Sequence, residues 1–118
     1  MDIKKAFIVL PHWAKLILDC DKTWEIRSRN TKIRGKVGII ASKTGKIWGT
    51  TELVDSFPLT KELFDKNKDK HRILCDYEEL PSNYKYVWVL MVNVMMFYFF
   101  IRGSTGFDRD MKLILQLG

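Results

Sequence analysis

The chain has 118 residues, of which 47% are hydrophobic, and it carries a formal net charge of +6. This length and composition predict one globular domain over residues 1–118, and they exclude an intrinsically disordered chain, which lacks the apolar residues for a core. The two cysteines, Cys20 and Cys75, match neither a disulfide framework nor a zinc ligand set. We therefore expect reduced thiols and no metal or other cofactor.

The start of the chain does not look like a secretory signal, because the apolar stretch Ala6–Leu10 is short and Pro11 ends it. A cytoplasmic location is the resulting expectation. The β-branched and aromatic residues of Lys5–Leu10 instead predict a first strand. Pro11 suits the first turn of a helix, where its missing N–H costs nothing. Trp13, Leu16 and Ile17 then form one apolar face of a short helix that ends near Cys20.

Thr23–Ser28 alternates between apolar and polar residues. Trp24 and Ile26 share one face of the predicted strand, and Glu25 and Arg27 share the other. This pattern is typical of a strand that is buried on one side only.

A polar loop over Arg29–Gly35 is expected to lead into a hairpin. Its strands are predicted over Lys36–Ser42 and Lys46–Asp55, joined by a turn at Lys43–Gly45. Gly49, inside the second strand, indicates a bulge or a close approach to the backbone.

The middle of the chain predicts a helix over Leu59–Asn67, capped by Thr60, and then a charged loop over Lys66–Asn83. His71 lies in this loop and is expected on the surface. Neither His71 nor His12 has a third ligand at a spacing that metal sites use.

Val87–Ile101 is apolar except for Asn93. It is shorter than the roughly 20 residues of a membrane-spanning helix, and its Val, Tyr, Phe and Trp content favours strands. We expect no membrane span, but strands over Tyr84–Val94, Phe97–Ile101 and Lys112–Leu117. Several short strands with two helices predict a compact, barrel-like α+β domain.

The positive charge is concentrated in the first half of the chain. Residues 1–50 contain 11 Lys and Arg against 4 Asp and Glu, whereas residues 51–118 contain 9 against 10. Within the first half, residues 27–46 hold seven cations and no acid. A polyanion is the natural partner for such a stretch, which predicts RNA, with DNA as an alternative, in a basic cleft. A basic surface without a partner is the competing interpretation.

Lys22, Glu25 and Arg27 form a mixed-charge cluster at the polar face of the predicted strand 23–28. Glu accepts hydrogen bonds from exocyclic amines, and Arg and Lys donate to carbonyls or phosphates, so the cluster suits recognition of a base edge. Trp13 and Trp24 are candidates for stacking on an unpaired base. The alternatives are a solvated strand face with a surface ion pair and two tryptophans that belong to the core.

The order of several motifs resembles the ASCH domain family of the PUA-like superfamily. The similar motifs, spread over residues 5–94, are Pro11-His12-Trp13-Ala14, Lys22-Thr23-Trp24-Glu25-Ile26-Arg27, Arg34-Gly35-Lys36-Val37, Ala41-Ser42, Gly49 with Glu52-Leu53-Val54-Asp55, and a Tyr-x-x-Trp-Val-Leu strand that ends at Leu90. The resemblance implies a small mixed β-barrel with an N-terminal helix and a second short helix in the middle segment. It also implies RNA-related roles and a cleft lined by Lys22, Glu25 and Arg27. The chain departs from the family at Cys20-Asp21, where many members have Gly, and over residues 95–118.

Some small proteins of this family are amidohydrolases that act on N(4)-acetylcytidine. They are thought to use the turn lysine as base, a threonine three positions later as nucleophile, and a glutamate of the middle segment. Lys22 matches the lysine, but Glu25 stands where the threonine would be, and Glu62 and Glu78 are both candidates for the acid. Binding without catalysis is therefore favoured. Alternatives are this hydrolase, a ribonuclease that uses Lys22 and Glu25, and a protein-interaction domain.

The resulting hypothesis is recognition of RNA or of a modified nucleoside, in an unknown oligomeric state. Lys22, Glu25 and Arg27 would read one splayed nucleotide beside Trp13 or Trp24. The residues expected to hold phosphates are Arg29, Lys32, Arg34 and Lys36.

Overall fold

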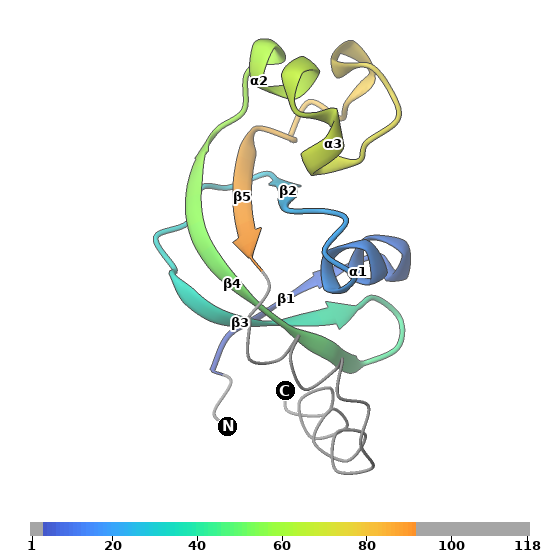
Figure 1. The fold of residues 1–118 in the computed structure, drawn as a ribbon, viewed down its shortest axis with the longest axis vertical. Coiled ribbons are helices and arrows are strands. Elements are labelled where there is room, and N and C mark those ends of the chain that lie inside the picture. Colours follow the sequence, from blue (N-terminus) through green and yellow to red (C-terminus); the bar gives the residue numbers. More distant parts are fainter. Residues whose placement is uncertain (1–3, 92–118) are drawn as a thin grey trace.

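The computed structural model describes residues 4–91, which form a mixed sheet of five strands with helices packed against it (Figure 1). The elements in chain order are β1 (Ala6–Val9), α1 (Pro11–Leu18), β2 (Trp24–Arg27), β3 (Gly35–Ala41), β4 (Lys46–Pro58), α2 (Lys61–Lys66), α3 (Lys68–His71), the short 3₁₀ helix η1 (Tyr77–Glu79) and β5 (Tyr86–Met91). The predicted α+β class is confirmed, as are the predicted helices after Pro11 and Thr60.

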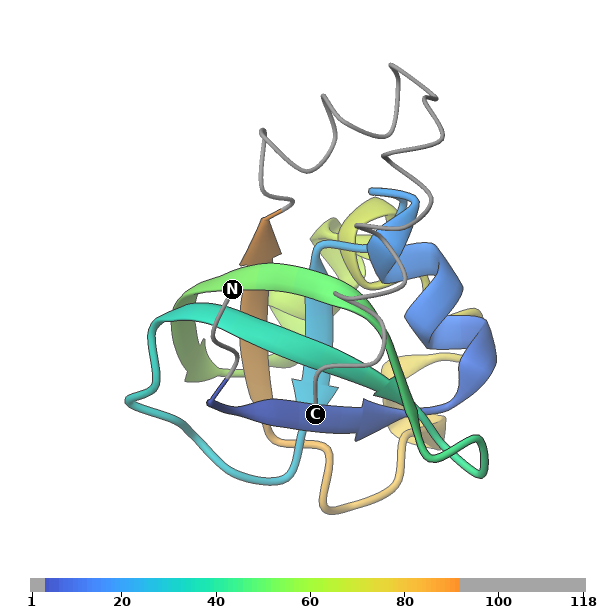
Figure 2. The same cartoon turned by 90° about the horizontal axis from the view of Figure 1, so that it is seen from below.

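The strands lie in the order β1-β3-β4-β5-β2, so β1 and β2 are the two edges of the sheet. β1 runs parallel to β3, and the other neighbouring strands are antiparallel. Within residues 4–91 no backbone pairing joins β1 to β2, and the predicted β-barrel is therefore not confirmed. A side chain connects the edges instead, because Arg27 Nη1 donates a 2.9 Å hydrogen bond to the carbonyl of Ile8. Figure 2 shows the end of β2 directed toward β1.

β4 is a long, bent strand that pairs with β3 through its first part and with β5 through its second. The register shifts by one residue at Trp48 and again at Val54, and bulges of this kind bend a strand. The first bulge adjoins Gly49, as predicted. A Cβ atom at Gly49 would lie 2.6 Å from Leu18 Cδ2, so the glycine lets α1 pack closely on the sheet.

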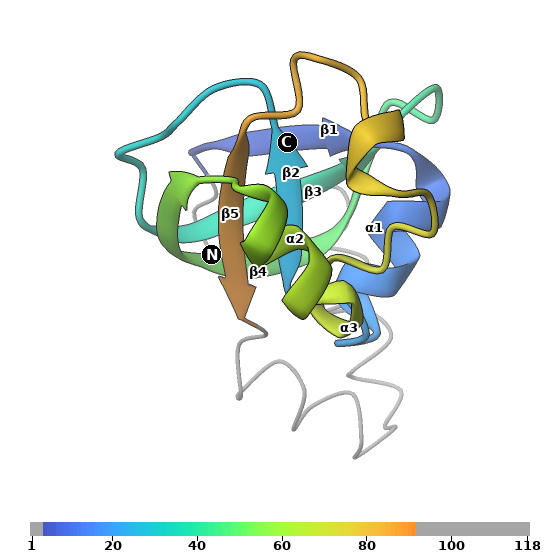
Figure 3. The same ribbon diagram turned by 90° about the horizontal axis from the view of Figure 1, so that it is seen from above.

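Two groups of buried apolar residues hold the fold together. The first lies between α1 and strands β1, β3 and β4, and it includes Ala14, Ile17 and Ile39. The second lies between the segment around α2 and strands β2 and β5, and it includes Trp24, Ile26 and Phe64. Figure 3 shows α2 and α3 lying over β2 and β5. β2 therefore has packed neighbours on the face that carries Trp24 and Ile26, as its alternation predicted.

The other face of β2 differs from the prediction, because Glu25 is buried as well, with 6% of its surface exposed. The segment predicted as a loop over Lys66–Asn83 also differs, since it contains α3 and η1. No helix within residues 4–91 has the length and hydropathy to cross a membrane. The strands predicted over Phe97–Ile101 and Lys112–Leu117 lie outside the described residues.

Candidate functional site

A pocket of about 440 Å³ lies between the two edges of the sheet. We call it the edge pocket, and four parts of the chain line it. They are the end of β1 with the start of α1, the strand β2 with Lys22 and Ser28, Ser42 at the end of β3, and the segment 73–84. Its volume falls within the range of about 300–1,000 Å³ that is usual for sites of small organic ligands. Lys22, Glu25 and Arg27 all line this pocket, together with Trp13.

Lys22 is directed inward by the turn that follows α1. The backbone N–H groups of Asp21 and Lys22 both donate to the carbonyl of Leu16, and Cys20 adopts the left-handed conformation with φ of 68°. Glycine favours this conformation, so Cys20 holds a strained backbone in this turn.

The Lys22 ammonium is almost completely buried and makes three contacts. Nζ donates to the carbonyl of His71 at 2.5 Å, lies 3.7 Å from Glu25 Oε1, and sits 4.4 Å from the ring centroid of Trp13. Burial lowers the pKa of Lys22 to about 8, although the charge of Glu25 opposes this shift. An ammonium with a pKa close to neutrality is suited both to ion pairing and to proton transfer.

Glu25 lies between two cations. Its Oε1 faces Lys22, and its Oε2 accepts a hydrogen bond from Arg27 Nη1 at 3.3 Å. Burial raises the pKa of the Glu25 carboxyl, against the opposing effects of Lys22 and Arg27. The three groups thus form one continuous chain of charge along the pocket wall, and the alternative of a solvated surface pair does not apply to Glu25.

Arg27 is the most accessible of the three groups, with 29% of its side chain exposed. Its guanidinium carbon lies 5.4 Å from the ring centroid of Phe7 and 5.2 Å from that of Trp88. Such cation–π contacts fix the plane of the guanidinium. Arg27 therefore joins β1, β2 and β5 while it keeps part of its donor edge open to the pocket.

The two candidate tryptophans lie in different environments. Trp13 lines the edge pocket and is partly buried. Trp24 belongs to the second core group, packs edge-on against Phe57 at 5.4 Å and does not line the pocket. Only Trp13 is placed to stack on a ligand there, whereas Trp24 has the core role that was its alternative.

His71 was expected on the surface, and this expectation is wrong, because the residue is fully buried. Its ring stacks on Phe64 with 4.1 Å between centroids, Nε2 lies 2.8 Å from the Phe64 carbonyl, and Nδ1 accepts from the N–H of Ile73. Its own carbonyl accepts the hydrogen bond from Lys22. The charged neighbours that suggested a surface loop belong to the exposed side of α3, and no sequence signal identified the buried side.

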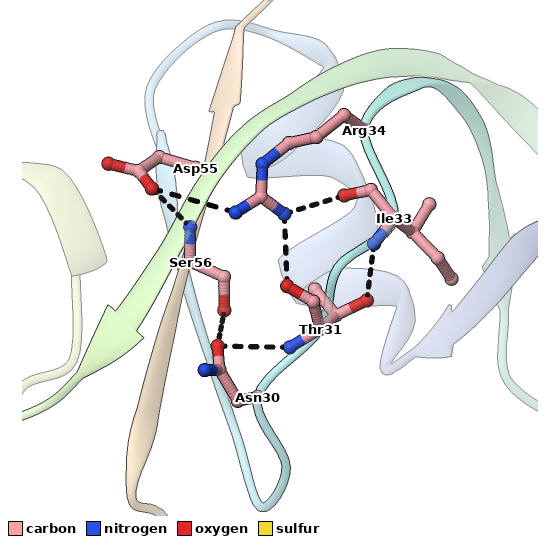
Figure 4. A network of polar contacts seen from close by, with 6 residues as sticks. All are labelled: Asn30, Thr31, Ile33, Arg34, Asp55 and Ser56. Atoms are coloured by element: carbon pink, nitrogen blue, oxygen red, sulfur yellow. Dashed lines mark hydrogen bonds and ion pairs between the residues drawn. The ribbon is translucent and has the colours of Figure 1, made fainter.

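The four cations expected to hold phosphates lie outside the edge pocket. Arg34 is held by its own loop, since its Nη1 donates to the carbonyls of Thr31 and Ile33 and its Nη2 lies 3.7 Å from Asp55 Oδ1 (Figure 4). Lys36 lies opposite Glu52 in the sheet. Arg29 and Lys32 have exposed side chains. Their roles as phosphate contacts stay predictions.

Polar contacts join the loop before β3, which carries Arg29, Lys32 and Arg34, to the neighbouring strands. Asn30 Oδ1 accepts from the N–H of Thr31 and from Ser56 Oγ, which ties the loop to β4 (Figure 4). Trp88 Nε1 donates to the carbonyl of Arg29 at 2.9 Å and ties the loop to β5. These contacts attach the loop to both β4 and β5.

The pocket also contains residues that the sequence did not single out as a site. Cys75 and Tyr84 line the wall formed by segment 73–84, and Ser42 lines the wall beside β1. Glu62 and Glu78, the candidate acids, are exposed and pair with Lys66 and Lys61 respectively, away from the pocket. Within residues 4–91, no group of three His, Cys, Asp or Glu side chains is arranged to hold a metal ion.

Comparisons with known proteins agree on one family. The family model described as ASCH domain matches residues 7–98. Among solved structures, a mutant form of the ASCH protein of Zymomonas mobilis is 20% identical, with 75% of this chain and 68% of that chain covered and a TM-score of 0.60. The Zymomonas mobilis ASCH structure is 12% identical over 94% of each chain, with a TM-score of 0.59. At such identities these neighbours show a shared fold alone. No curated protein sequence matches.

Proposed function

The chain belongs to the ASCH domain family, and from this premise we propose that it binds RNA by taking one unpaired nucleotide, or a modified nucleoside, into the edge pocket without catalysis. The family is generally associated with RNA binding, which sets the class of partner. The observation that carries the proposal is the presence of Lys22, Glu25, Arg27 and Trp13 on the walls of one pocket of suitable size.

The chemistry of the pocket suits a nucleobase. The exposed part of Arg27 supplies donors in a planar fork, and Glu25 supplies carboxylate oxygens, so a base edge with both carbonyl and amine groups finds partners for each. Trp13 and Tyr84 offer aromatic surface beside these polar groups. A ligand of this kind is held by stacking and read by hydrogen bonds.

Lys22 has a different part in this proposal. Its ammonium is engaged by the His71 carbonyl, by Glu25 and by the face of Trp13, so it orients Glu25 and the indole more than it contacts the ligand. We therefore assign Lys22 to positioning, and Glu25 and Arg27 to recognition.

The first test is a titration of the protein with cytidine, uridine, adenosine, guanosine and N(4)-acetylcytidine, followed by tryptophan fluorescence. Trp13 in the pocket wall and Trp88 beside Arg27 serve as reporters. We expect saturable binding of at least one nucleoside. Glu25→Gln should change the order of preference among them, because the amide both donates and accepts where the carboxylate only accepts.

Glu62→Gln is the matched control, since Glu62 is an exposed carboxylate that pairs with Lys66 on α2. It should leave both affinity and preference unchanged. If no nucleoside binds to the wild-type protein, or if Glu25→Gln alters neither affinity nor preference, the proposal is wrong. Partner proteins that remain bound after nuclease treatment would then favour an interaction domain.

A hydrolytic function is the second candidate, and the lowered pKa of Lys22 is the observation in its favour. A general base is most effective when its pKa lies near the working pH. This candidate predicts release of acetate from N(4)-acetylcytidine that is lost in Lys22→Met. Binding without acetate release supports the noncatalytic function instead.

A further inference from the structure

Ser42 is the first residue after β3, and it lines the edge pocket where the chain turns toward β4. Its Oγ atom is buried, yet among residues 4–91 it has no hydrogen-bond partner. No other buried side-chain oxygen or nitrogen of the described chain is left in this state. Buried hydroxyl groups are almost always hydrogen-bonded, so an unpaired one on a pocket wall points to a partner that comes from outside the chain.

The neighbouring backbone groups already have other hydrogen-bond partners. The N–H of Ser42 donates to the carbonyl of Val9 at 2.7 Å, and the carbonyl of Leu10 accepts from Ala14 in the first turn of α1. Among the described residues, the side chains that line the pocket at the end of β1 are the apolar ones of Ile8, Val9 and Leu10, and the Ile8 carbonyl is already engaged by Arg27 Nη1. Ser42 Oγ is thus an unpaired polar side-chain atom beside apolar side chains, and such a group discriminates between ligands with and without a matching polar group.

We propose that Ser42 Oγ is a specificity-determining group that binds a second polar edge of the nucleoside, apart from the edge that Glu25 and Arg27 read. The two sets of groups stand on different walls, because Ser42 follows β3 and lies beside β1, whereas Glu25 and Arg27 come from β2. A hydroxyl both donates and accepts, so the matching ligand edge carries a carbonyl, an amine or a hydroxyl. This inference rests on the proposed function and deepens it: the ligand must be polar at two edges, as a nucleoside is.

The test is the variant Ser42→Ala, which removes one oxygen and keeps the size of the side chain. We expect the dissociation constant of the preferred nucleoside, among the five named above, to rise about tenfold, equivalent to about 1.4 kcal/mol. The melting temperature of the free protein should stay the same or rise, because the variant removes an unpaired buried hydroxyl. If Ser42 had a purely structural role, Ser42→Ala would lower the melting temperature and leave the dissociation constant unchanged.

Ser56→Ala is the matched control, because Ser56 Oγ is paired with Asn30 Oδ1 and lies outside the pocket. It should lower the melting temperature and leave nucleoside affinity unchanged. An affinity of Ser42→Ala within about twofold of the wild type, or a fall in its melting temperature like that of Ser56→Ala, overturns the inference while the proposed function stands. If the wild-type protein binds none of the five nucleosides, the proposed function fails, and the inference fails with it.

Discussion

Glu25 decides the electrostatic balance of the edge pocket, because among the described residues it is the one acid that lines it. Burying the charged groups of Lys22 and Glu25 is costly, and their contacts with each other and with Arg27 offset this cost only in part. The pKa shifts show that the cost of burial exceeds the gain from the contacts. Burial raises the pKa of Glu25 and lowers that of Lys22, so it favours the neutral form of each group. The cluster is therefore a poor source of stability.

The pKa of Lys22 leads to a prediction about stability at alkaline pH. In the folded protein this pKa is about 8, whereas in the unfolded chain it is near 10.5, the ordinary value of lysine. Between these values the unfolded chain binds more protons, so the free energy of unfolding rises with pH. We expect Lys22 to contribute up to about 3 kcal/mol of added stability between pH 8 and pH 10.5.

The measurement compares urea denaturation of the wild-type protein and Lys22→Met across this pH range. The rise should be present in the wild type and absent in Lys22→Met. Lys66→Met, which removes an exposed lysine paired with Glu62, should behave as the wild type does. If the free energy of unfolding changes with pH in the same way in the wild type and in Lys22→Met, the buried ammonium does not have the lowered pKa.

At the scale of elements, the short helix α3 is joined to its neighbours in part by the buried side chain of His71. His71 joins it to α2 through the Phe64 carbonyl and joins the following segment through the N–H of Ile73. These contacts assign the neutral tautomer, with Nε2 as donor and Nδ1 as acceptor. The carbonyl of His71 also accepts the hydrogen bond from Lys22. By fixing the position of His71, the neutral imidazole therefore helps to position Lys22 in the pocket wall.

Protonation of His71 is expected to destabilise this arrangement. A proton on Nδ1 would face the N–H of Ile73, and burial already lowers the pKa of His71. The unfolded chain, with a histidine pKa near 6.5, binds the proton first as the pH falls, so stability is lost below this pH. The loss due to His71 should reach at most about 2 kcal/mol by pH 5.

Thermal or urea unfolding at pH 7 and pH 5 measures this effect. His71→Leu should be less stable than the wild type at pH 7 and should lose less stability between the two pH values. His12→Gln, a change on the exposed side of α1, is the control and should keep the wild-type pH dependence. An equal loss in His71→Leu and the wild type would contradict a neutral, buried His71.

For the molecule as a whole, the placement of charge around the edge pocket suggests how a strand of RNA would be held. Ser28 and Ser42 both line the pocket, and each is followed directly by an exposed cation, Arg29 and Lys43 respectively. Because both cations adjoin residues of the pocket wall, we expect each to lie near a phosphate that flanks a bound nucleotide. Arg34 is less available for this purpose because its guanidinium is engaged by its own loop and by Asp55.

We expect binding of a short single-stranded RNA to weaken as salt is raised, whereas binding of an uncharged nucleoside should be almost insensitive to salt. Arg29→Ala and Lys43→Ala should each reduce the slope of log K against log salt by about 0.7. Lys66→Ala on α2 should leave the slope unchanged. Equal slopes for all three variants would place the phosphate contacts elsewhere on the molecule.

The sequence by itself determined the elements that depend on local signals, but not α3 or η1. Local signals were sufficient for α1 after Pro11, for the Thr60 cap, for the bulge beside Gly49 and for the alternation of β2, because each depends on residues close together in the chain. The resemblance to ASCH domains likewise rested on short motifs, and it pointed to Lys22, Glu25 and Arg27 as a group.

Tertiary structure alone decided which faces became buried and which residues met. The polar face of β2 became buried because the end of β1, the start of α1 and the segment 73–84 lie against it, and none of these is near Glu25 in the sequence. The same long-range packing buried His71 and left Trp13 at the pocket. The burial of Lys22, Glu25 and His71, and with it the shift of each pKa, arises from contacts between distant segments, so no local pattern in the chain encodes it.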